Sequence, residues 1–285
     1  MRKNVLVFLA LSALIACGGA SATSSSQTTA AMPKAGDVDG KITWAMAGAH
    51  RLDSAKKRDA FRHPKETLEF FGLKDDMHVV ELWPGAGAWY TEILGPVLAE
   101  RGELTITNYS AEGPADSYAV KDSKKLTEKL ASAPQVFGKV RVKTVALPDS
   151  VNLGVDESAD LVLTFRNLHN WVEDKSEMKV ISAAFKVLKH GGTFGVVDHR
   201  AKPDADPTKA GDTGYLPEAW VIKTVEGAGF KLAAKSEINA NPKDTKDHPK
   251  GVWNLPPVLT GGDADRAKYE AIGESDRMTL RFIKP

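Results

Sequence analysis

The residues in this chain that are best suited to bind a small ligand form a glycine turn. The segment from Val79 to Leu94 reads VVELWPGAGAWYTEIL and places Glu81 shortly before Gly85 and Gly87. Glycines at such a turn let the backbone approach a ligand closely, because no Cβ is in the way and positive φ angles are tolerated. Apolar residues precede the turn and helical spacing follows it. The pattern therefore predicts a buried strand, a ligand-binding turn and a helix.

The spacing of the glycines favours one nucleotide cofactor over another. A dinucleotide fingerprint has a third glycine three residues after the second, and this chain has Tyr90 there. The first motif of class I S-adenosylmethionine (SAM) methyltransferases resembles this segment more closely: an acid followed by glycines at the second, fourth and sixth positions. Glu81, Gly85 and Gly87 match it, whereas Trp83 stands where its first glycine belongs. SAM is the predicted cofactor, and a purely architectural glycine turn is the alternative.

Polar residues also follow the other predicted strands, at the edge of the sheet where doubly wound folds bind their ligands. Asn108 follows the second strand, where a SAM site prefers an acid that binds the ribose, and an amide forms the weaker hydrogen bond. Arg166 and Asn167 follow the fourth strand. The predicted cofactor-binding residues are Glu81, Trp83, Gly85, Gly87, Asn108, Arg166 and Asn167.

Three further residues at this edge are predicted to be catalytic. His169 lies just beyond Asn167, and Asp198 and His199 follow the fifth strand. Histidine can remove a proton from a hydroxyl or an amine near neutral pH, so we predict that His169 is a general base. Two histidines and a carboxylate also permit an open metal site. They lack the short helical spacing typical of such a site, and we predict no metal.

The alternation of elements predicts an α/β fold with a doubly wound sheet. Continuous apolar runs such as Leu161 to Leu163 suit strands that are buried on both faces of a parallel sheet. Strands are expected near 78–82, 103–108, 140–145, 160–165 and 193–198, and helices near 88–100, 121–131, 174–189 and 217–228.

The two ends of the domain are expected to differ from a dinucleotide-binding fold. An N-terminal helical extension comes first: a charged helix at 53–62 with a mostly solvated basic face, then a helix that Pro64 opens and Gly72 ends. Late strands at 230–238 and 278–283 have no crossover helix pattern between them. We therefore expect an antiparallel last strand, with 239–276 looping over or beside the cleft.

The N-terminal residues predict export and a lipid anchor. Residues 1–16 combine a basic start with an apolar core too short to span a membrane, which is typical of a signal peptide. Cys17, the sole cysteine, follows Leu14-Ile15-Ala16 as in a bacterial lipobox, and an ordinary secretory leader is the alternative. Residues 17–40 are then the lipidated cysteine and a flexible tether, and 41–285 the domain. Gly18 favours an outer-membrane location facing the periplasm.

Composition excludes one class of partner and leaves others open. The 285 residues carry a formal net charge of +1, without the basic excess typical of a nucleic-acid-binding protein. The chain contains no Gly-x-Ser-x-Gly elbow, so a serine hydrolase is not indicated. The expected partners are a small-molecule substrate and a membrane reached through the lipid anchor.

Several motifs together resemble one bacterial family of predicted SAM-dependent methyltransferases, often secreted or lipoprotein-like. The resemblance covers about residues 48–285 and is carried by the segments TFRNLHNW, LKHGGTFGVVDHRA and WPGAGAWYTEIL. It implies a class I methyltransferase-like sheet, mostly parallel with an antiparallel last strand, and SAM-dependent methyl transfer to a small molecule. The alternative is a ligand-binding lipoprotein that keeps this fold without the reaction, since SAM is made in the cytoplasm.

Overall fold

The computed structural model describes residues 31–147 and 150–285. The predicted signal peptide, the lipobox cysteine Cys17 and most of the predicted tether lie outside these residues. Helix α1 (Val38–Ala47) begins inside the range 17–40 that composition predicts to be a tether. Within the described residues, no helix has both the length and the apolar character needed to cross a membrane.

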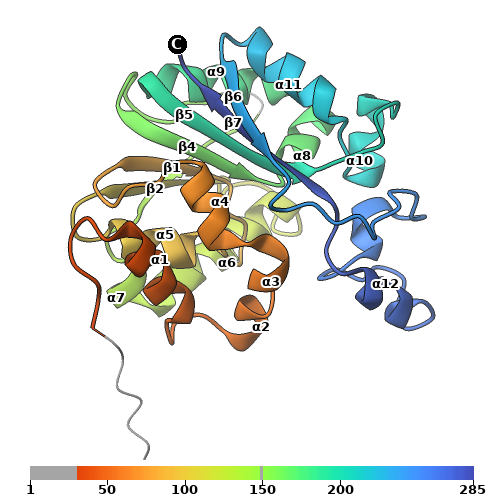
Figure 1. Cartoon of the computed structure of the whole chain (residues 1–285), viewed down its shortest axis with the longest axis horizontal. Helices are drawn as coiled ribbons and strands as arrows, with labels where there is room; N and C mark the ends of the chain where they lie inside the picture. The colour runs from red at the N-terminus through yellow and green to blue at the C-terminus, as the bar shows by residue number, and fades with distance from the viewer. Residues whose placement is uncertain (1–30, 148–149) are drawn as a thin grey trace, which may run out of the picture. The chain divides into compact units, whose positions relative to one another are not determined.

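The described residues form a seven-stranded sheet of order β3-β2-β1-β4-β5-β7-β6 (Figure 1). Its strands are β1 (His78–Leu82), β2 (Glu103–Asn108), β3 (Arg141–Thr144), β4 (Ala159–Phe165), β5 (Leu188–His199), β6 (Lys231–Ser236) and β7 (Arg277–Ile283). The first five strands pair in parallel, and β7 is antiparallel to both β5 and β6. The predicted fold class and its antiparallel last strand are confirmed.

Helices cover both faces of the sheet (Figure 1). Before and between the strands lie α2 (Asp53–Lys56), α3 (Asp59–Arg62), α4 (Pro64–Phe70), α5 (Thr91–Leu98), α6 (Tyr118–Ser132) and α7 (Pro134–Phe137). The later helices are α8 (Leu168–Glu173), α9 (Glu177–Val187), α10 (Ala210–Thr213), α11 (Glu218–Gly227) and α12 (Arg266–Ile272), with short 3-10 turns at η1 (Pro207–Lys209) and η2 (Gly251–Asn254).

Two apolar cores explain why the central strands read as continuous apolar runs. Alternate residues of a strand point to opposite faces. In β4, Leu161 and Leu163 pack with α1, α4 and α5 on one face, whereas Val162 packs with α9 and α11 on the other. Residues on both faces of such a strand are therefore buried, and the resulting apolar run identifies a central strand.

The N-terminal extension departs from its predicted form. The single helix expected at 53–62 is divided into α2 and α3. The sequence also predicts a mostly solvated face for the basic residues of this stretch, Arg51 and Arg62 among them, and this is wrong for these two, which are both 2% exposed. Both guanidinium groups lie over the ring of Trp89, and acidic partners bind them. Cation–π contacts and ion pairs stabilise these charges in the interior.

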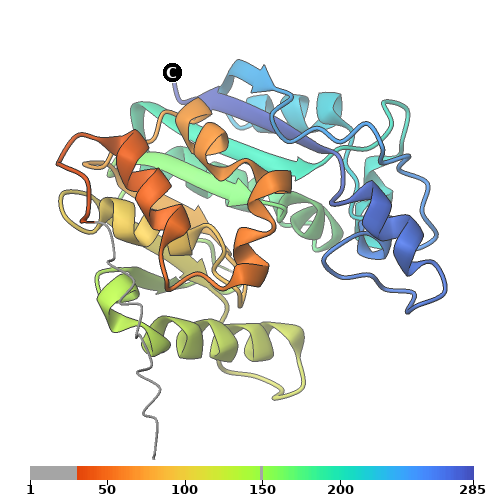
Figure 2. The ribbon, with the colours of Figure 1, turned by 60° about the horizontal axis from the view of Figure 1, so that its bottom comes forward.

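The parallel strands all direct their carboxyl ends toward the same edge of the sheet. The arrowheads of β4 and β5 point toward the late segment that carries α12, drawn in dark blue (Figures 1 and 2). This segment belongs to the long connection between β6 and β7, which was expected to loop over or beside the cleft. The polar residues that follow β1, β2, β4 and β5 gather at this edge.

Candidate functional site

The glycine turn between β1 and α5 has the open geometry that a ligand-binding turn needs. Gly85 has φ = +71°, a left-handed conformation that favours glycine. A Cβ added to Gly85 or to Gly87 would meet nothing within 4 Å. The amide of Ala86 donates a hydrogen bond to Oδ1 of Asp122 over 3.0 Å, so α6 holds the turn in place. Sequence reasoning missed Asp122, because its partner lies 36 residues away.

Glu81 lies beneath this turn and organises its exit into α5. Its carboxyl is buried, and Oε2 accepts a hydrogen bond from the hydroxyl of Thr91 over 2.7 Å. Burial raises the pKa of Glu81 to about 7, against the smaller opposing effects of the Thr91 hydrogen bond and the Arg166 charge. The structure therefore places Glu81 where it positions the first residue of α5.

The raised pKa of Glu81 has a consequence for stability. Because the folded protein holds this proton more tightly than the unfolded chain, Glu81 contributes stability that is full below the unfolded pKa of 4.5 and is lost as pH rises toward 7. The loss should reach about 3 kcal/mol above pH 7. Urea denaturation at pH 4.5 and pH 8 measures this loss in the free energy of unfolding. The decrease between the two pH values should be larger in the wild type than in Glu81→Gln. An equal pH dependence of the two proteins would contradict the assignment.

Trp83 occupies its predicted place but packs inside the protein. Its φ of 39° is left-handed, the conformation for which the wider motif has a glycine. The ring is buried against Tyr109 and Trp171, at centroid distances of 5.9 and 5.6 Å. The packing of this aromatic group compensates for the backbone strain. Trp83 therefore supports the glycine turn from the protein interior.

Asn108 ends β2 as predicted, but its side chain is occupied within the chain. Its Oδ1 accepts a hydrogen bond from the amide of Tyr109 over 2.8 Å, and its Nδ2 donates to the carbonyl of Ser123 over 3.4 Å. Asn108 therefore stabilises the β2–α6 connection. The adjoining pocket is lined by Tyr109 and Tyr118, and not by Asn108.

Two neighbouring residues after β4 have different surroundings. Nδ2 of Asn167 donates hydrogen bonds to the carbonyl of Leu82 over 2.8 Å and to the hydroxyl of Thr164 over 3.2 Å, which ties the ends of β1 and β4 together. Arg166 lines the pocket, and its backbone is left-handed with φ = 63°. Bulky residues rarely adopt this backbone conformation. Where they do adopt it, they are often found at functional sites.

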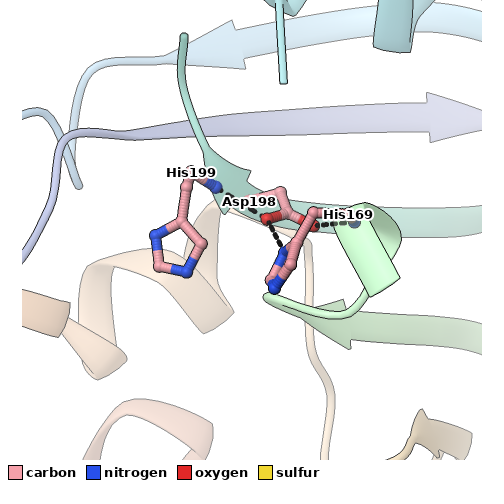
Figure 3. A group of neighbouring side chains, drawn as sticks. All are labelled: His169, Asp198 and His199. Carbon is pink, nitrogen blue, oxygen red and sulfur yellow. Dashed lines mark hydrogen bonds and ion pairs between the residues drawn. The ribbon is translucent and has the colours of Figure 1, made fainter. Parts of the chain in front are cut away.

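His169 and Asp198 form a buried pair at the ends of α8 and β5 (Figure 3). Nδ1 of His169 lies 2.9 Å from Oδ1 of Asp198. That oxygen also accepts a hydrogen bond from the backbone amide of His199 over 2.7 Å, and Oδ2 accepts one from the backbone amide of Leu168 over 2.8 Å. A carboxylate only accepts hydrogen bonds, so Nδ1 carries the proton and Nε2 keeps a free lone pair. This is the tautomer that a general base requires.

His199 lies beside this pair, with the two imidazole centroids 5.2 Å apart. Its Nδ1 is 2.5 Å from the hydroxyl oxygen of Ser275, a residue of the late connection. Burial lowers the pKa of His199 well below its usual value, and the neighbouring His169, Arg166 and Arg277 lower it further. His199 is therefore neutral at neutral pH and can act as a hydrogen-bonding group.

The same three residues meet the geometric requirement of a metal site only loosely. His169, Asp198 and His199 offer ligand atoms that all lie within 4.8 Å of one another. However, both oxygens of Asp198 already accept hydrogen bonds, so direct coordination would disrupt its contacts with His169 and the backbone. The positive charges that depress the pKa of His199 also oppose a cation at this point.

These elements surround a single pocket of about 700 Å³. The volume suits a nucleoside cofactor together with a small substrate. Of the predicted site residues, Gly87, Arg166, His169 and His199 line it. The lining residues that sequence reasoning did not select include Tyr109, Tyr118, Arg58, Arg62, Trp253, Glu274 and Ser275. They come from the N-terminal extension, the β2–α6 connection and the late connection, where no local motif indicates a site.

Solved structures with the same fold include SAM-dependent methyltransferases. A SAM-dependent methyltransferase from Aquifex aeolicus is 15% identical, with a TM-score of 0.51 over 82% of this chain and 100% of the other. The [4+2]-cyclase SpnF is 16% identical, with a TM-score of 0.54 over 84% of this chain and 86% of the other. The sequence matches no protein-family model and no curated protein. The chain therefore has the class I methyltransferase fold, shown by structure at low identity.

Proposed function

We propose that this protein transfers a methyl group from SAM to a small-molecule acceptor. The observation that carries the proposal is the arrangement of one pocket, which Gly87 borders at the glycine turn and His169 borders at the start of α8. The space that a Cβ of Gly85 or Gly87 would occupy is open, which fits a cofactor lying against the turn.

The residues around the pocket have distinct roles in this proposal. Gly85 and Gly87 bring the backbone to the cofactor, and Tyr109 and Tyr118 supply aromatic surface for its nucleoside. Bound SAM supplies an electrophilic methyl group on a sulfonium, so that alignment with the acceptor is the main catalytic requirement. Nε2 of His169 accepts the proton of an acceptor hydroxyl or amine, and Asp198 keeps the imidazole oriented and stabilises its charged form.

The cofactor site is tested by calorimetric titration of the full-length protein with S-adenosylhomocysteine (SAH), up to millimolar concentration. We expect binding in the wild type and at least about tenfold weaker binding in Gly87→Val, whose side chain enters the pocket. Gly87 is a better test position than Gly85, because valine at Gly85 would also strain a left-handed backbone. A hundredfold excess of SAH over its Kd should also raise stability by about 2.7 kcal/mol.

Gly227→Val is the matched control. Gly227 ends α11 on the surface, away from the pocket, and a Cβ there also meets nothing within 4 Å. Its variant should bind SAH as the wild type does. A folded wild type that binds no SAH at millimolar concentration would contradict the proposal, and NADH should not bind.

A second candidate function is ligand binding without methyl transfer, in a lipoprotein that keeps the fold. The observation that favours it is the side chain of Asn108, whose amide is committed to Tyr109 and Ser123. A SAM site gains affinity from an acid at this point, since a carboxylate forms charge-assisted hydrogen bonds. A folded protein that binds no SAH would favour this second function, whereas SAH binding together with SAH formation from SAM would favour methyl transfer.

We also propose that the protein is exported and anchored by lipid at Cys17, on an outer membrane facing the periplasm. The support is the apolar segment that ends in Leu14-Ile15-Ala16 directly before this cysteine. Two or three acyl chains hold a protein stably on a membrane, whereas one chain is marginal.

Mass spectrometry of the mature N-terminus tests the anchor. We expect a diacyl- or triacyl-cysteine at position 17, and Cys17→Ala should leave the protein without lipid and free of the membrane fraction. An unmodified cysteine, or cleavage at another residue, would refute this proposal.

A further inference from the structure

One end of the pocket gathers more positive charge than its acidic partner can balance. Glu274 is 4% exposed and accepts hydrogen bonds from Arg58 over 2.6 Å, from Arg62 over 2.9 Å and from Arg277 over 2.9 Å. A single carboxylate thus serves three guanidinium groups. The group of Arg58, Arg62, Arg277 and Glu274 is called the arginine cluster below.

The cluster also holds hydrogen-bond donors that no group of the described residues satisfies. Nη1 of Arg62 and Nε of Arg277 are buried without a partner among the described residues. Arg62 is 2% exposed and lines the pocket. Buried donors of this kind are normally satisfied, so an unpaired guanidinium nitrogen at a pocket wall indicates a missing acceptor.

Arg166 adds a fourth cation to the same wall. Within residues 31–147 and 150–285, its guanidinium has no ion-pair partner within 4.0 Å. Burial, with the nearby charges of Arg277 and Arg58, lowers the pKa of Arg166 to about 10, although Glu274 opposes this. The side chain is therefore still charged at neutral pH. Its left-handed backbone at φ = 63° places this unpaired cation in the pocket despite the strain.

The opposite end of the pocket has the reverse electrostatic character. Burial raises the pKa of Tyr109, and the neighbouring groups that raise it further are Tyr118, Asp122 and Asp174. At the cluster end, Arg166 and Arg277 act in the other direction and lower the pKa of His199. A cationic sulfonium is favoured near the acidic end and an anion near the arginines.

We propose that the methyl acceptor carries an oxyanion, a carboxylate or a phosphate, that Arg166 and Arg62 bind at the arginine cluster. The inference rests on the proposed methyl transfer and assigns Arg166 to the acceptor. Guanidinium groups bind both oxyanions through paired, charge-assisted hydrogen bonds. The two arginines of the pocket wall that can form them are Arg166, which has no ion-pair partner among the described residues, and Arg62, whose Nη1 is unpaired there. His169 and His199 line the same pocket, so an acceptor anchored there presents its hydroxyl or amine to the base.

Titration with inorganic phosphate at constant ionic strength tests this site in the full-length protein. Phosphate should bind the wild type, and Arg166→Gln should weaken that binding about ten- to hundredfold. Because Arg166 forms no ion pair with the part of the chain that the structure describes, this variant breaks none there and should fold normally. Arg166→Lys keeps the charge without the paired geometry and should retain part of the affinity. Arg141→Gln removes an exposed surface pair with Glu103 and should change nothing.

A second titration tests whether Arg166 binds the oxyanion of the acceptor or the carboxylate of the cofactor. SAH carries that carboxylate, whereas 5′-methylthioadenosine lacks the amino-acid part. The proposal predicts that Arg166→Gln leaves the affinities for both compounds unchanged but weakens the binding of phosphate. A loss of SAH affinity alone would place the cofactor's carboxylate at Arg166 and overturn the proposal, as would phosphate binding that is independent of Arg166. Phosphate binding at Arg166 without any SAH binding would refute the proposed methyl transfer and leave the oxyanion site supported.

Discussion

Replacing His169 by alanine should lower the rate of methyl transfer by about 10²- to 10⁴-fold, the contribution of a general base. The effect should be on kcat, because His169 faces the acceptor while the glycine turn holds the cofactor. Methyl transfer can be followed as SAH formation from SAM, with small acids that carry a hydroxyl or an amine as acceptors. His190→Ala is the matched control, since His190 is 70% exposed and belongs to the start of β5, away from the pocket.

Asp198→Asn tests the positioning of the base apart from the base itself. Asp198 accepts hydrogen bonds from Nδ1 of His169 and from backbone amides, and an asparagine would present an N–H to one of these donors. The ¹⁵N chemical shifts of the His169 imidazole should then report a changed tautomer, and kcat should fall with little change in SAH affinity. Full activity in His169→Ala would show that the acceptor needs no base from this residue.

Glu274→Gln should lower the free energy of unfolding by about 3–5 kcal/mol, because it leaves buried guanidinium groups without their counter-charge. The carboxylate is the common partner of Arg58, Arg62 and Arg277. A glutamine retains one acceptor oxygen but turns an N–H group toward the arginine donors. Urea denaturation at pH 7 measures the loss.

Glu103→Gln provides the comparison for this stability prediction. Glu103 pairs with Arg141 on the surface, where the two side chains are 30% and 69% exposed. Water screens such a pair, so the expected loss is below about 1 kcal/mol. If Glu274→Gln destabilises the protein no more than Glu103→Gln does, the arginine cluster does not depend on its carboxylate.

The parts of the site that follow strands were predictable from the sequence. His169 follows β4, Asp198 and His199 end β5, and parallel neighbours bring the carboxyl ends of their strands together. The late antiparallel pair was predictable for a related reason, since 239–276 shows no helical periodicity long enough for a crossover. The short α12 lies in that range without forming one.

The basic wall of the pocket was not predictable from local pattern. Arg58 and Arg62 lie in a charged stretch that has the composition of a solvated helix face. Their partner Glu274 is 216 and 212 residues away, and a contact of that length leaves no local signal. Asn108 shows a finer limit: its position at the end of β2 was predicted, but the direction of its amide depends on Tyr109 and Ser123.

A crystal structure of the full-length protein with SAH is the most direct test of this account. It should show the nucleoside between Gly87 and the tyrosines Tyr109 and Tyr118, with the sulfur directed toward His169 and the arginine cluster free of the cofactor. SAH bound outside this pocket, or with its carboxylate on Arg166, would contradict the assignment of the two ends of the pocket.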